Sequence, residues 1–342
     1  MSSSSTLEST LTRNWLHRGL LAWCLLPVAC LFRLTVGLRR SLYSLGWLRS
    51  TRLPAPVIVV GNIFIGGTGK TPLVIYLVQA MRAAGFTPGV ISRGYGSKGS
   101  EPQRVGEQGS PQEVGDEPLL IAQRAGCPVM VGRNRVAAAQ ALLAQHPQVN
   151  LIISDDGLQH YALARDIEIV LFDARGAGNG WMLPAGPLRE PLSRKRDFTV
   201  VNGGQAMGLQ GKIYAMHLSG TDAYQLMQPS HTRPLASFRE NKSLRVLAAA
   251  GIGNPARFFS MLRQSDLSFE EMPLPDHYEF AQNPFVSSSA DIILITEKDA
   301  VKCRLHDALR NDPRLWVIPV SAQVDAALPK KIVEKLRGFP TA

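Results

Sequence analysis

Short apolar runs rich in branched residues alternate along the chain with longer segments that have apolar residues at helical spacing. In the first part of the chain, the runs predict strands at 57–60, 89–92, 128–131, 151–154, 167–172 and 198–201. Strands that are apolar on both faces are typical of a parallel sheet with helices on either side. The pattern therefore predicts an α/β fold with a doubly wound, mostly parallel sheet.

The alternation weakens in the second half of the chain and then resumes. Short polar pieces with glycine and proline follow the last of these strands, and a new set of apolar runs occurs at 245–250, 291–296 and 316–320. This predicts a second, smaller α/β domain. The expected parts are an N-terminal helical segment (1–52), a larger α/β domain (53–202), a linker (203–243) and the smaller α/β domain (244–342).

The N-terminal segment contains an uncharged apolar run at 19–32, with Pro27 in its middle. The run is shorter than the roughly 20 residues that a bilayer span needs, and the proline favours a kink. Residues 34–48 continue with apolar positions around Arg39 and Arg40, which is typical of a basic amphipathic helix. We predict a helix at a membrane surface. A true span, a secretory signal and a buried core helix are the alternatives.

Charge is concentrated in the same segment. The chain has 342 residues and a formal net charge of +10, of which residues 1–52 contribute +6. Such a patch attracts either nucleic acid or an anionic membrane. These arginines flank apolar residues and tryptophans, without a nucleic-acid recognition motif, so a membrane surface is favoured and nucleic acid is not expected. The four cysteines lack CxxC or zinc-ligand spacing, which indicates reduced thiols in a cytosolic protein.

A glycine-rich loop, GGTGKT at 66–71, lies between the first predicted strand and a helical pattern. In that context backbone N–H groups and the helix N-terminus bind phosphates. Lys70 is expected to reach the β- and γ-phosphates and Thr71 to bind Mg²⁺. The strict P-loop pattern has glycine at the position of Phe64, and a glycine loop that binds nothing is the alternative. The expected ATP-binding residues are Phe64, Ile65, Gly66, Gly67, Thr68, Gly69, Lys70 and Thr71.

Two adjacent carboxylates, Asp155 and Asp156, follow the apolar run 151–154. In P-loop proteins an acid at the end of such a strand binds Mg²⁺, and adjacent carboxylates repel each other unless a cation is nearby. We expect Thr71, Asp155 and Asp156 to form the metal site, with either aspartate as the direct ligand. A solvated Asp-Asp-Gly turn is the alternative.

Eight motifs follow one another along the chain: GNIFIGGTGKTP (61–72), SRGYG (92–96), VGDEP (114–118), SDDGLQH (154–160), LPAGPLRE (183–190), AGIGNPARFF (250–259), PDHY (275–278) and TEKDAVK (296–302). In this order they resemble the tetraacyldisaccharide 4′-kinases of lipid A synthesis, from the apolar N-terminal segment to about Val320. The resemblance implies transfer of the ATP γ-phosphoryl group to the 4′-hydroxyl of a lipid-linked disaccharide 1-phosphate, which forms lipid IVA. It also implies a peripheral or monotopic enzyme at the cytoplasmic face of the inner membrane.

The resemblance also implies catalytic roles. The catalytic carboxylate of the family falls on VGDEP, so Asp116 is the expected base, with His277 of PDHY as its partner and Lys70 as a further catalytic residue. A histidine beside a carboxylate can tune its basicity and orientation. A helix N-cap for Asp116 and a purely structural His277 are the alternatives.

Polar residues near the strand ends are expected to contact the acceptor, since ligands of open α/β sheets bind there. The expected contacts are Arg93, Tyr95, Arg133, Asn134, Gln159, His160, Arg189 and Glu190, each with a surface ion pair or internal hydrogen bond as its alternative. Glu297, Lys298 and Asp299 follow the run 291–296 and predict a nucleotide-base contact, an interdomain contact or a structural role.

Three other functions are compatible with a P-loop. A kinase for a soluble sugar or nucleoside would not need the apolar N-terminal segment. A P-loop ATPase that acts as a switch or metal-insertion chaperone would lack PDHY and LPAGPLRE. A non-catalytic membrane scaffold would not be expected to keep Lys70, Thr71 and both aspartates intact.

Overall fold

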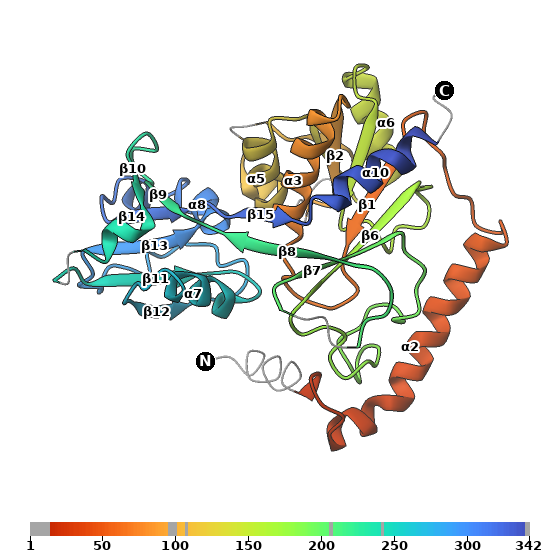
Figure 1. The fold of residues 1–342 in the computed structure, drawn as a ribbon, viewed down its shortest axis with the longest axis horizontal. Helices are drawn as coiled ribbons and strands as arrows, with labels where there is room; N and C mark the ends of the chain where they lie inside the picture. Colours follow the sequence, from red (N-terminus) through yellow and green to blue (C-terminus); the bar gives the residue numbers. More distant parts are fainter. Residues whose placement is uncertain (1–13, 95–100, 107–108, 205–207, 241–242, 339–342) are drawn as a thin grey trace.

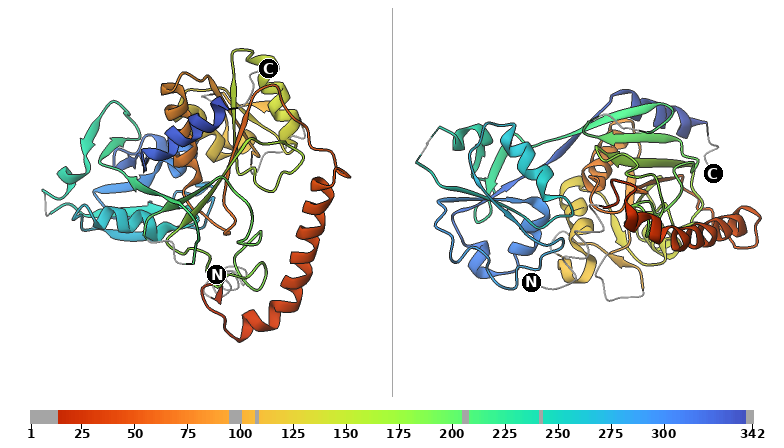
Figure 2. Two further views of the ribbon diagram at one scale, coloured as in Figure 1. Left: turned by 45° about the vertical axis from the view of Figure 1, so that its right-hand side comes forward. Right: turned by 90° about the horizontal axis from the view of Figure 1, so that it is seen from below.

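The computed structural model describes residues 14–94, 101–106, 109–204, 208–240 and 243–338. Two α/β domains lie side by side, connected by extended chain, and one long helix stands outside both of them (Figures 1 and 2). The predicted α/β fold with a second, smaller α/β domain and an N-terminal apolar helix is confirmed.

The larger domain is built on a sheet of nine strands in the described part of the chain, in the order β15-β8-β7-β6-β1-β5-β2-β4-β3. Pairing is parallel from β8 to β4, and the strands at both edges are antiparallel. The strands are β1 (Val57–Gly61), β2 (Pro88–Ser92), β3 (Gln103–Arg104), β4 (Val129–Val131), β5 (Leu151–Asp155), β6 (Ile167–Asp173), β7 (Phe198–Asn202), β8 (Ile213–Ser219) and β15 (Ser321–Val324).

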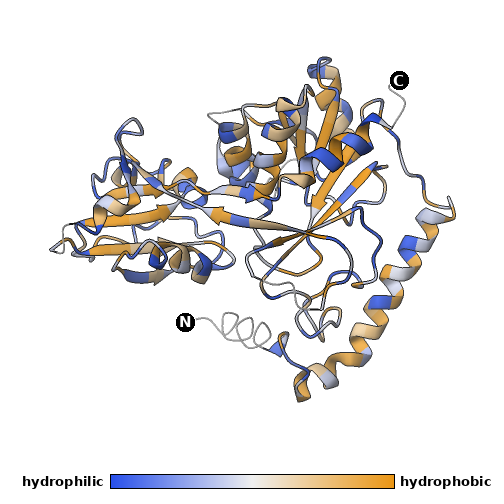
Figure 3. Cartoon of the chain, viewed as in Figure 1, coloured by the Kyte–Doolittle hydropathy of each residue, from blue (hydrophilic) through white to orange (hydrophobic). Residues whose placement is uncertain are grey.

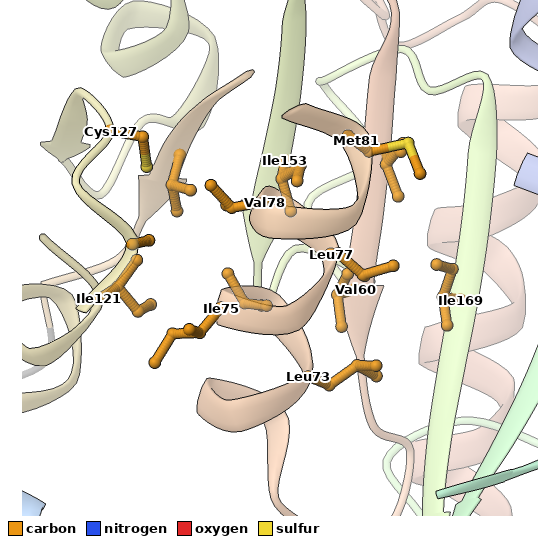
Figure 4. Packing of buried hydrophobic residues seen from close by; sticks show 14 of the residues in the cluster. Val60, Leu73, Ile75, Leu77, Val78, Met81, Ile121, Cys127, Ile153 and Ile169 are labelled. Carbon is orange, nitrogen blue, oxygen red and sulfur yellow. The ribbon is translucent and has the colours of Figure 1, made fainter. Parts of the chain in front are cut away.

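Helices cover this sheet, and the central one fixes the position of the glycine loop. They are α3 (Lys70–Ala83), α4 (Pro111–Val114), α5 (Asp116–Ala125), α6 (Arg135–Gln145) and α10 (Ala327–Arg337). Along α3, Leu73, Leu77 and Met81 recur every four residues, are fully buried and face Val60 and Ile169 of the sheet (Figure 4). Each such side chain contributes about 1.5–3 kcal/mol on burial, so the helix that begins at Lys70 is firmly held.

The smaller domain has a sheet of six strands among the described residues, in the order β10-β9-β14-β13-β11-β12. Its strand β11 (Val246–Ala250) is apolar on both faces: Ala248 belongs to the same buried cluster as Phe258 and Phe259, and Leu247 belongs to the cluster of the opposite layer. Its elements are β9 (Asp222–Gln225), β10 (Thr232–Pro234), η1 (Leu235–Phe238), β11 (Val246–Ala250), α7 (Pro255–Arg263), β12 (Glu270–Pro273), β13 (Ile292–Thr296), α8 (Glu297–Cys303), α9 (Asp307–Arg310) and β14 (Leu315–Ile318).

The domain boundaries differ from the predicted ones in two places. Residues 203–243, expected as a linker, contain β8 of the larger sheet and β9 and β10 of the smaller one. Residues 321–338, expected in the smaller domain, return to the larger one: β15 pairs with β8, and Leu328 and Ile332 of α10 join its core. By sheet membership, the smaller domain is inserted between β8 and β15.

The long outer helix is α2 (Leu20–Ser44), and it continues through Pro27. By length and composition it could cross a membrane, although only 11% of its most apolar window is buried. Figure 3 shows apolar residues along much of its length. The exposed large apolar side chains on it are Leu20, Leu21, Trp23, Val28, Leu31, Leu34 and Leu38.

Both ends of α2 are attached to loops of the larger domain. Just before the helix, the Trp15 indole Nε1 donates a hydrogen bond to the carbonyl oxygen of Pro184 (2.9 Å). The rings of Trp23 and Trp181 meet edge to face with centroids 4.8 Å apart, and near the other end Tyr43 lies 5.7 Å from the ring of Tyr161. The helix is thus held at its ends, with much of its surface exposed.

Candidate active site

The glycine loop connects the end of β1 to the start of α3. Gly69 is the N-cap residue of α3, with φ of 97°. A Cβ atom there would lie 2.5 Å from Nδ2 of Asn202, which donates a hydrogen bond to the Thr68 carbonyl oxygen (2.9 Å). Gly66 also has positive φ, 99°. Because only glycine adopts such angles without strain, the loop can place its N–H groups and the helix N-terminus towards an anion.

Phe64 and Ile65, which were expected to bind nucleotide, have other roles. The Phe64 side chain is buried, and the Arg175 guanidinium lies 4.2 Å from its ring centroid. The Ile65 N–H donates to the carbonyl oxygen of Pro187 (3.0 Å), in the LPAGPLRE loop. These two residues anchor the start of the loop, and residues 66–71 follow them to the start of α3.

Lys70 points towards the end of β5. Its Nζ donates to Asn62 Oδ1 (3.2 Å) and lies 3.7 Å from Oδ1 of Asp156. Arg189 Nη1 is 3.4 Å from the other oxygen of Asp156. Burial alone would raise the pKa of Asp156, but the charges of Lys70 and Arg189 outweigh it and lower that pKa. Asp156 is therefore held as an anion next to the loop.

Asp155 has the opposite environment. It is almost fully buried, accepts a hydrogen bond from Ser92 Oγ (3.1 Å), and its burial, helped by the nearby charge of Glu117, raises its pKa to about 7. Its Oδ1 and the Oδ1 of Asp156 have no hydrogen-bond partner among the described residues. Buried carboxylate oxygens that accept no hydrogen bond fit a hard divalent cation such as Mg²⁺.

The structure contains no group of three histidine, cysteine, aspartate or glutamate side chains arranged for a metal within its described ranges. Mg²⁺ usually keeps several waters and is held by one or two carboxylates together with substrate phosphates. The pair Asp155 and Asp156 fits a site of that kind.

Asp116, the first residue of α5, meets side chains of the smaller domain. It is 5% exposed, and its Oδ2 lies 3.0 Å from His277 Nδ1, 3.4 Å from Lys302 Nζ and 3.9 Å from Lys298 Nζ. Oδ1 accepts the N–H of Glu117 (2.9 Å), but the N-cap residue of α5 is Gly115, so Asp116 is not the helix cap. The structure brings Asp116 and His277 together, as the resemblance implied.

This surrounding positive charge determines the protonation of Asp116. Burial alone would raise its pKa, but the hydrogen bond with His277 and the charges of Lys298 and Lys302 hold it well below its usual range. The same hydrogen bond raises the pKa of His277, against the effect of burial. His277 adopts a left-handed φ of 57°, and its N–H donates to the Gly251 carbonyl oxygen (3.2 Å).

The TEKDAVK segment forms the contact between the two domains. Arg124 Nη1 of α5 donates to Glu297 Oε1 (2.5 Å), and Lys298 Nζ donates to Glu117 Oε1 (3.2 Å). The predicted interdomain contact is thus present. Lys302 was not singled out from the sequence, although its i, i+4 spacing from Lys298 puts both lysines on one face of a helix.

The expected acceptor contacts divide into two groups. Arg93 and Arg133 are exposed at the ends of β2 and β4, and Arg189 lies beside Asp156. His160 is partly buried, and desolvation together with nearby arginines lowers its pKa to about 4. Tyr95 lies outside the described residues.

Two of the expected acceptor contacts have structural roles instead. The Asn134 side-chain oxygen caps α6 by accepting the N–H groups of residues 136 and 137. Glu190 is 1% exposed: its Oε1 accepts a hydrogen bond from Gln159 Nε2 (2.9 Å), and its Oε2 accepts one from the Tyr161 hydroxyl (2.6 Å) and pairs with Arg194. These contacts use the side-chain oxygens of both residues.

Comparisons with known proteins agree on one family. The family model for tetraacyldisaccharide-1-P 4′-kinases matches residues 21–337. The tetraacyldisaccharide 4′-kinase of Janthinobacterium sp. (strain Marseille) is 63% identical over 338 residues, 98% of this chain and 97% of that protein. The enzyme of the same name from Herminiimonas arsenicoxydans is 59% identical over 349 residues, 99% of this chain and 98% of that one.

A solved structure is also similar. LpxK from Aquifex aeolicus, in a crystal structure with ATP, superposes with a TM-score of 0.77 at 29% identity. The similarity covers 93% of this chain and all of the other.

Proposed function

Because the chain belongs to the tetraacyldisaccharide 4′-kinase family, we propose that the residues described above transfer the γ-phosphoryl group of ATP to the 4′-hydroxyl of a tetraacyldisaccharide 1-phosphate. The product is the phosphorylated lipid known as lipid IVA. The observation that best supports this proposal is the distance of 3.0 Å between Asp116 Oδ2 and His277 Nδ1, in a chain that also has a glycine loop before α3. The first would supply proton acceptance and the second phosphate binding.

ATP would bind at residues 66–71. The loop N–H groups and the start of α3 would hold the phosphates, and Lys70 is already directed towards the metal-binding aspartates. Thr71, Asp155 and Asp156 would hold Mg²⁺, which neutralises charge on the β- and γ-phosphates when bound. Asn62, which accepts a hydrogen bond from Lys70, would keep that lysine aligned.

Asp116 would accept the proton of the 4′-hydroxyl. Its lowered pKa makes it a weak base, which is sufficient because phosphoryl transfer proceeds through a loose transition state with little demand for early deprotonation. His277 would orient the carboxylate and stabilise its charge. Arg93, Arg133, Arg189, Gln159 and His160 remain our proposed contacts to the sugar and its 1-phosphate.

We place the enzyme at the cytoplasmic face of the inner membrane, held by α2. The exposed apolar side chains of α2 and the arginines near its ends support this location. A lipid-linked acceptor does not leave the bilayer readily, so an enzyme attached to the surface meets it without extracting it.

The activity is tested with purified protein in detergent, γ-labelled Mg-ATP and tetraacylated disaccharide 1-phosphate. Wild type should transfer label to the lipid, and Asp116→Ala and His277→Ala should each lower kcat, by roughly 10²–10⁴ for the base. Asp307→Ala, which removes an exposed carboxylate of α9, is the matched control and should keep full activity. Hydrolysis of ATP without lipid labelling would instead favour the ATPase alternative.

Membrane attachment is tested by sedimentation with phosphatidylglycerol vesicles. Replacing Leu31, Leu34 and Leu38 by serine should release the protein from the vesicles and leave ATP binding intact. Val286→Ser, an equally exposed apolar residue on the smaller domain, is the control. Unchanged sedimentation of the triple variant would show that α2 is not the attachment site.

A further inference from the structure

One guanidinium of the smaller domain lies on the phosphate loop of the larger domain. Arg257, in the first turn of α7, donates a hydrogen bond from Nη1 to the carbonyl oxygen of Thr68 (3.1 Å). Its Nη2 lies 2.9 Å from Oδ2 of Asp173, at the end of β6. The AGIGNPARFF motif that contains Arg257 has no role in the phosphate binding or proton transfer described above.

The charges at this point do not balance. Asp173 is 1% exposed and is already paired with Arg175, whose Nε and Nη2 donate to its two oxygens at 3.0 Å and 2.7 Å. A single carboxylate therefore faces two guanidiniums. Arg175 also flanks the loop, since its Nη1 would be 3.7 Å from a Cβ atom on Gly66. Arg175 and Arg257 thus place more positive charge beside the loop than Asp173 balances, and a bound polyphosphate would offset it.

Arg257 is also well placed to make further contacts. An arginine presents five N–H donors, and the contacts to Thr68 and Asp173 use two of them. The side chain is 25% exposed, so it is not sealed in the interface. The three remaining donors can address an anion bound to the loop without breaking either contact.

The backbone before α7 fixes the approach of this arginine. A Cβ atom on Gly253 would lie 3.0 Å from the backbone nitrogen of Gly67, so the smaller domain contacts the loop there as well. Gly253 and Arg257 are four residues apart, with Pro255 between them at the helix start. Movement of the smaller domain would carry Arg257 with it.

We propose that Arg257 is a further catalytic residue of the kinase, which contacts the transferring phosphoryl group of ATP on the loop and stabilises its charge in the transition state. Asp173 holds the guanidinium at the loop before the nucleotide arrives. An arginine supplied within the same chain has this effect in other P-loop enzymes. The proposal rests on the proposed kinase function, and it makes the smaller domain a participant in catalysis at the phosphates.

The test compares ground-state and transition-state binding. Arg257→Ala and Arg257→Gln are measured for lipid kinase activity and for affinity for Mg-ADP, with and without aluminium fluoride as a mimic of the transferring phosphoryl group. We expect kcat to fall by roughly 10³-fold or more, while affinity for Mg-ADP alone changes by less than about threefold. The tightening caused by aluminium fluoride in wild type should be lost in both variants.

Two controls separate this role from a structural one. Arg263→Ala on the same helix removes a surface pair with Glu271 and should behave as wild type. Arg257→Gln keeps an N–H donor for the Thr68 carbonyl oxygen. If Arg257 served only to make that contact, this variant would retain activity. Retained aluminium fluoride tightening, or equal losses in Mg-ADP affinity and kcat, would overturn the proposal. Because nucleotide binding needs no lipid, failure of wild type to label the lipid would count against the kinase function and not against Arg257.

Discussion

Replacing Asp116 by asparagine should lower both the free energy of unfolding and kcat, for two different reasons. The change keeps the shape of the side chain but removes the charge that faces His277, Lys298 and Lys302. Lys298 keeps two other carboxylates, Glu117 at 3.2 Å and Asp276 at 3.4 Å. Lys302 therefore loses more favourable charge interaction than Lys298 does.

The magnitude follows from the position of Lys302. Its side chain is 4% exposed, its Nζ has no hydrogen-bond partner within the part of the chain that the structure describes, and Asp116 lies 3.4 Å away. With an effective dielectric constant of about 20, a pair at that distance attracts by about 5 kcal/mol. Asp299 also acts on Lys302. We therefore expect Asp116→Asn to lower the free energy of unfolding by about 3 kcal/mol, the low end for a buried charge that loses its partner.

The double variant Asp116→Asn/Lys302→Met separates the two effects. Methionine replaces the buried Lys302 ammonium, which has lost its carboxylate partner, by an apolar group. The free energy of unfolding of the double variant should therefore lie within about 1 kcal/mol of that of Lys302→Met alone. The kcat should stay roughly 10²–10⁴ below wild type, because the base is still missing. Urea unfolding, followed by tryptophan fluorescence in detergent, and the lipid kinase assay measure the two quantities.

Two results would refute this reasoning. If Asp116→Asn unfolds within about 0.5 kcal/mol of wild type, Lys302 does not depend on that carboxylate. If the double variant recovers kcat, Asp116 is not the base. Asp291→Asn, which breaks an exposed pair with Arg245, is the matched control and should unfold at the same urea concentration as wild type.

Three further predictions concern single positions. Asn134→Ala should lower the free energy of unfolding by about 1 kcal/mol, as loss of a helix cap does, with an unchanged KM for the lipid; a raised KM would restore its role as an acceptor contact. Gly69→Ala should abolish ATP binding in calorimetry, because its Cβ would meet Asn202, whereas Gly85→Ala, with a similar φ of 92° and open space, should bind normally. His160→Gln should reduce acid sensitivity: burial lowers the pKa of His160 from 6.5 to about 4, so stability that is complete above pH 6.5 is lost as pH falls towards 4. An identical pH dependence of urea unfolding in wild type and His160→Gln would contradict this.

The strands that the sequence predicted well are those buried on both faces. The run at 57–60 became β1, and the run at 151–154 became β5 with Asp155 as its last residue. β8 was missed because it lies near a sheet edge and alternates, with Tyr214 and Met216 buried between exposed neighbours. Such a pattern near glycines resembles a loop, and its partner β15 lies far away in sequence.

Site residues were predictable where one short segment carries the chemistry. A phosphate loop needs only a strand, glycines and a helix in order, so the local pattern predicted the loop that the structure has between β1 and α3. Asp116 and His277 are 161 positions apart, and only the family resemblance connected them. Arg257 and Lys302 were missed because their partners lie in the other domain. Asn134 shows a different limitation. A polar residue after a strand can bind a ligand or cap the next helix, and the local sequence pattern is the same for both roles.

The insertion of the smaller domain between β8 and β15 has a consequence for synthesis. A ribosome releases the chain from its N-terminus, so β8 emerges before the smaller domain and β15 emerges after it. Until β15 has emerged, β8 has an open strand edge. α3, which begins at Lys70, packs against both β15 and α10. The nucleotide-binding half therefore reaches its final packing only after β15 and α10 have been made, later than the domain that supplies His277.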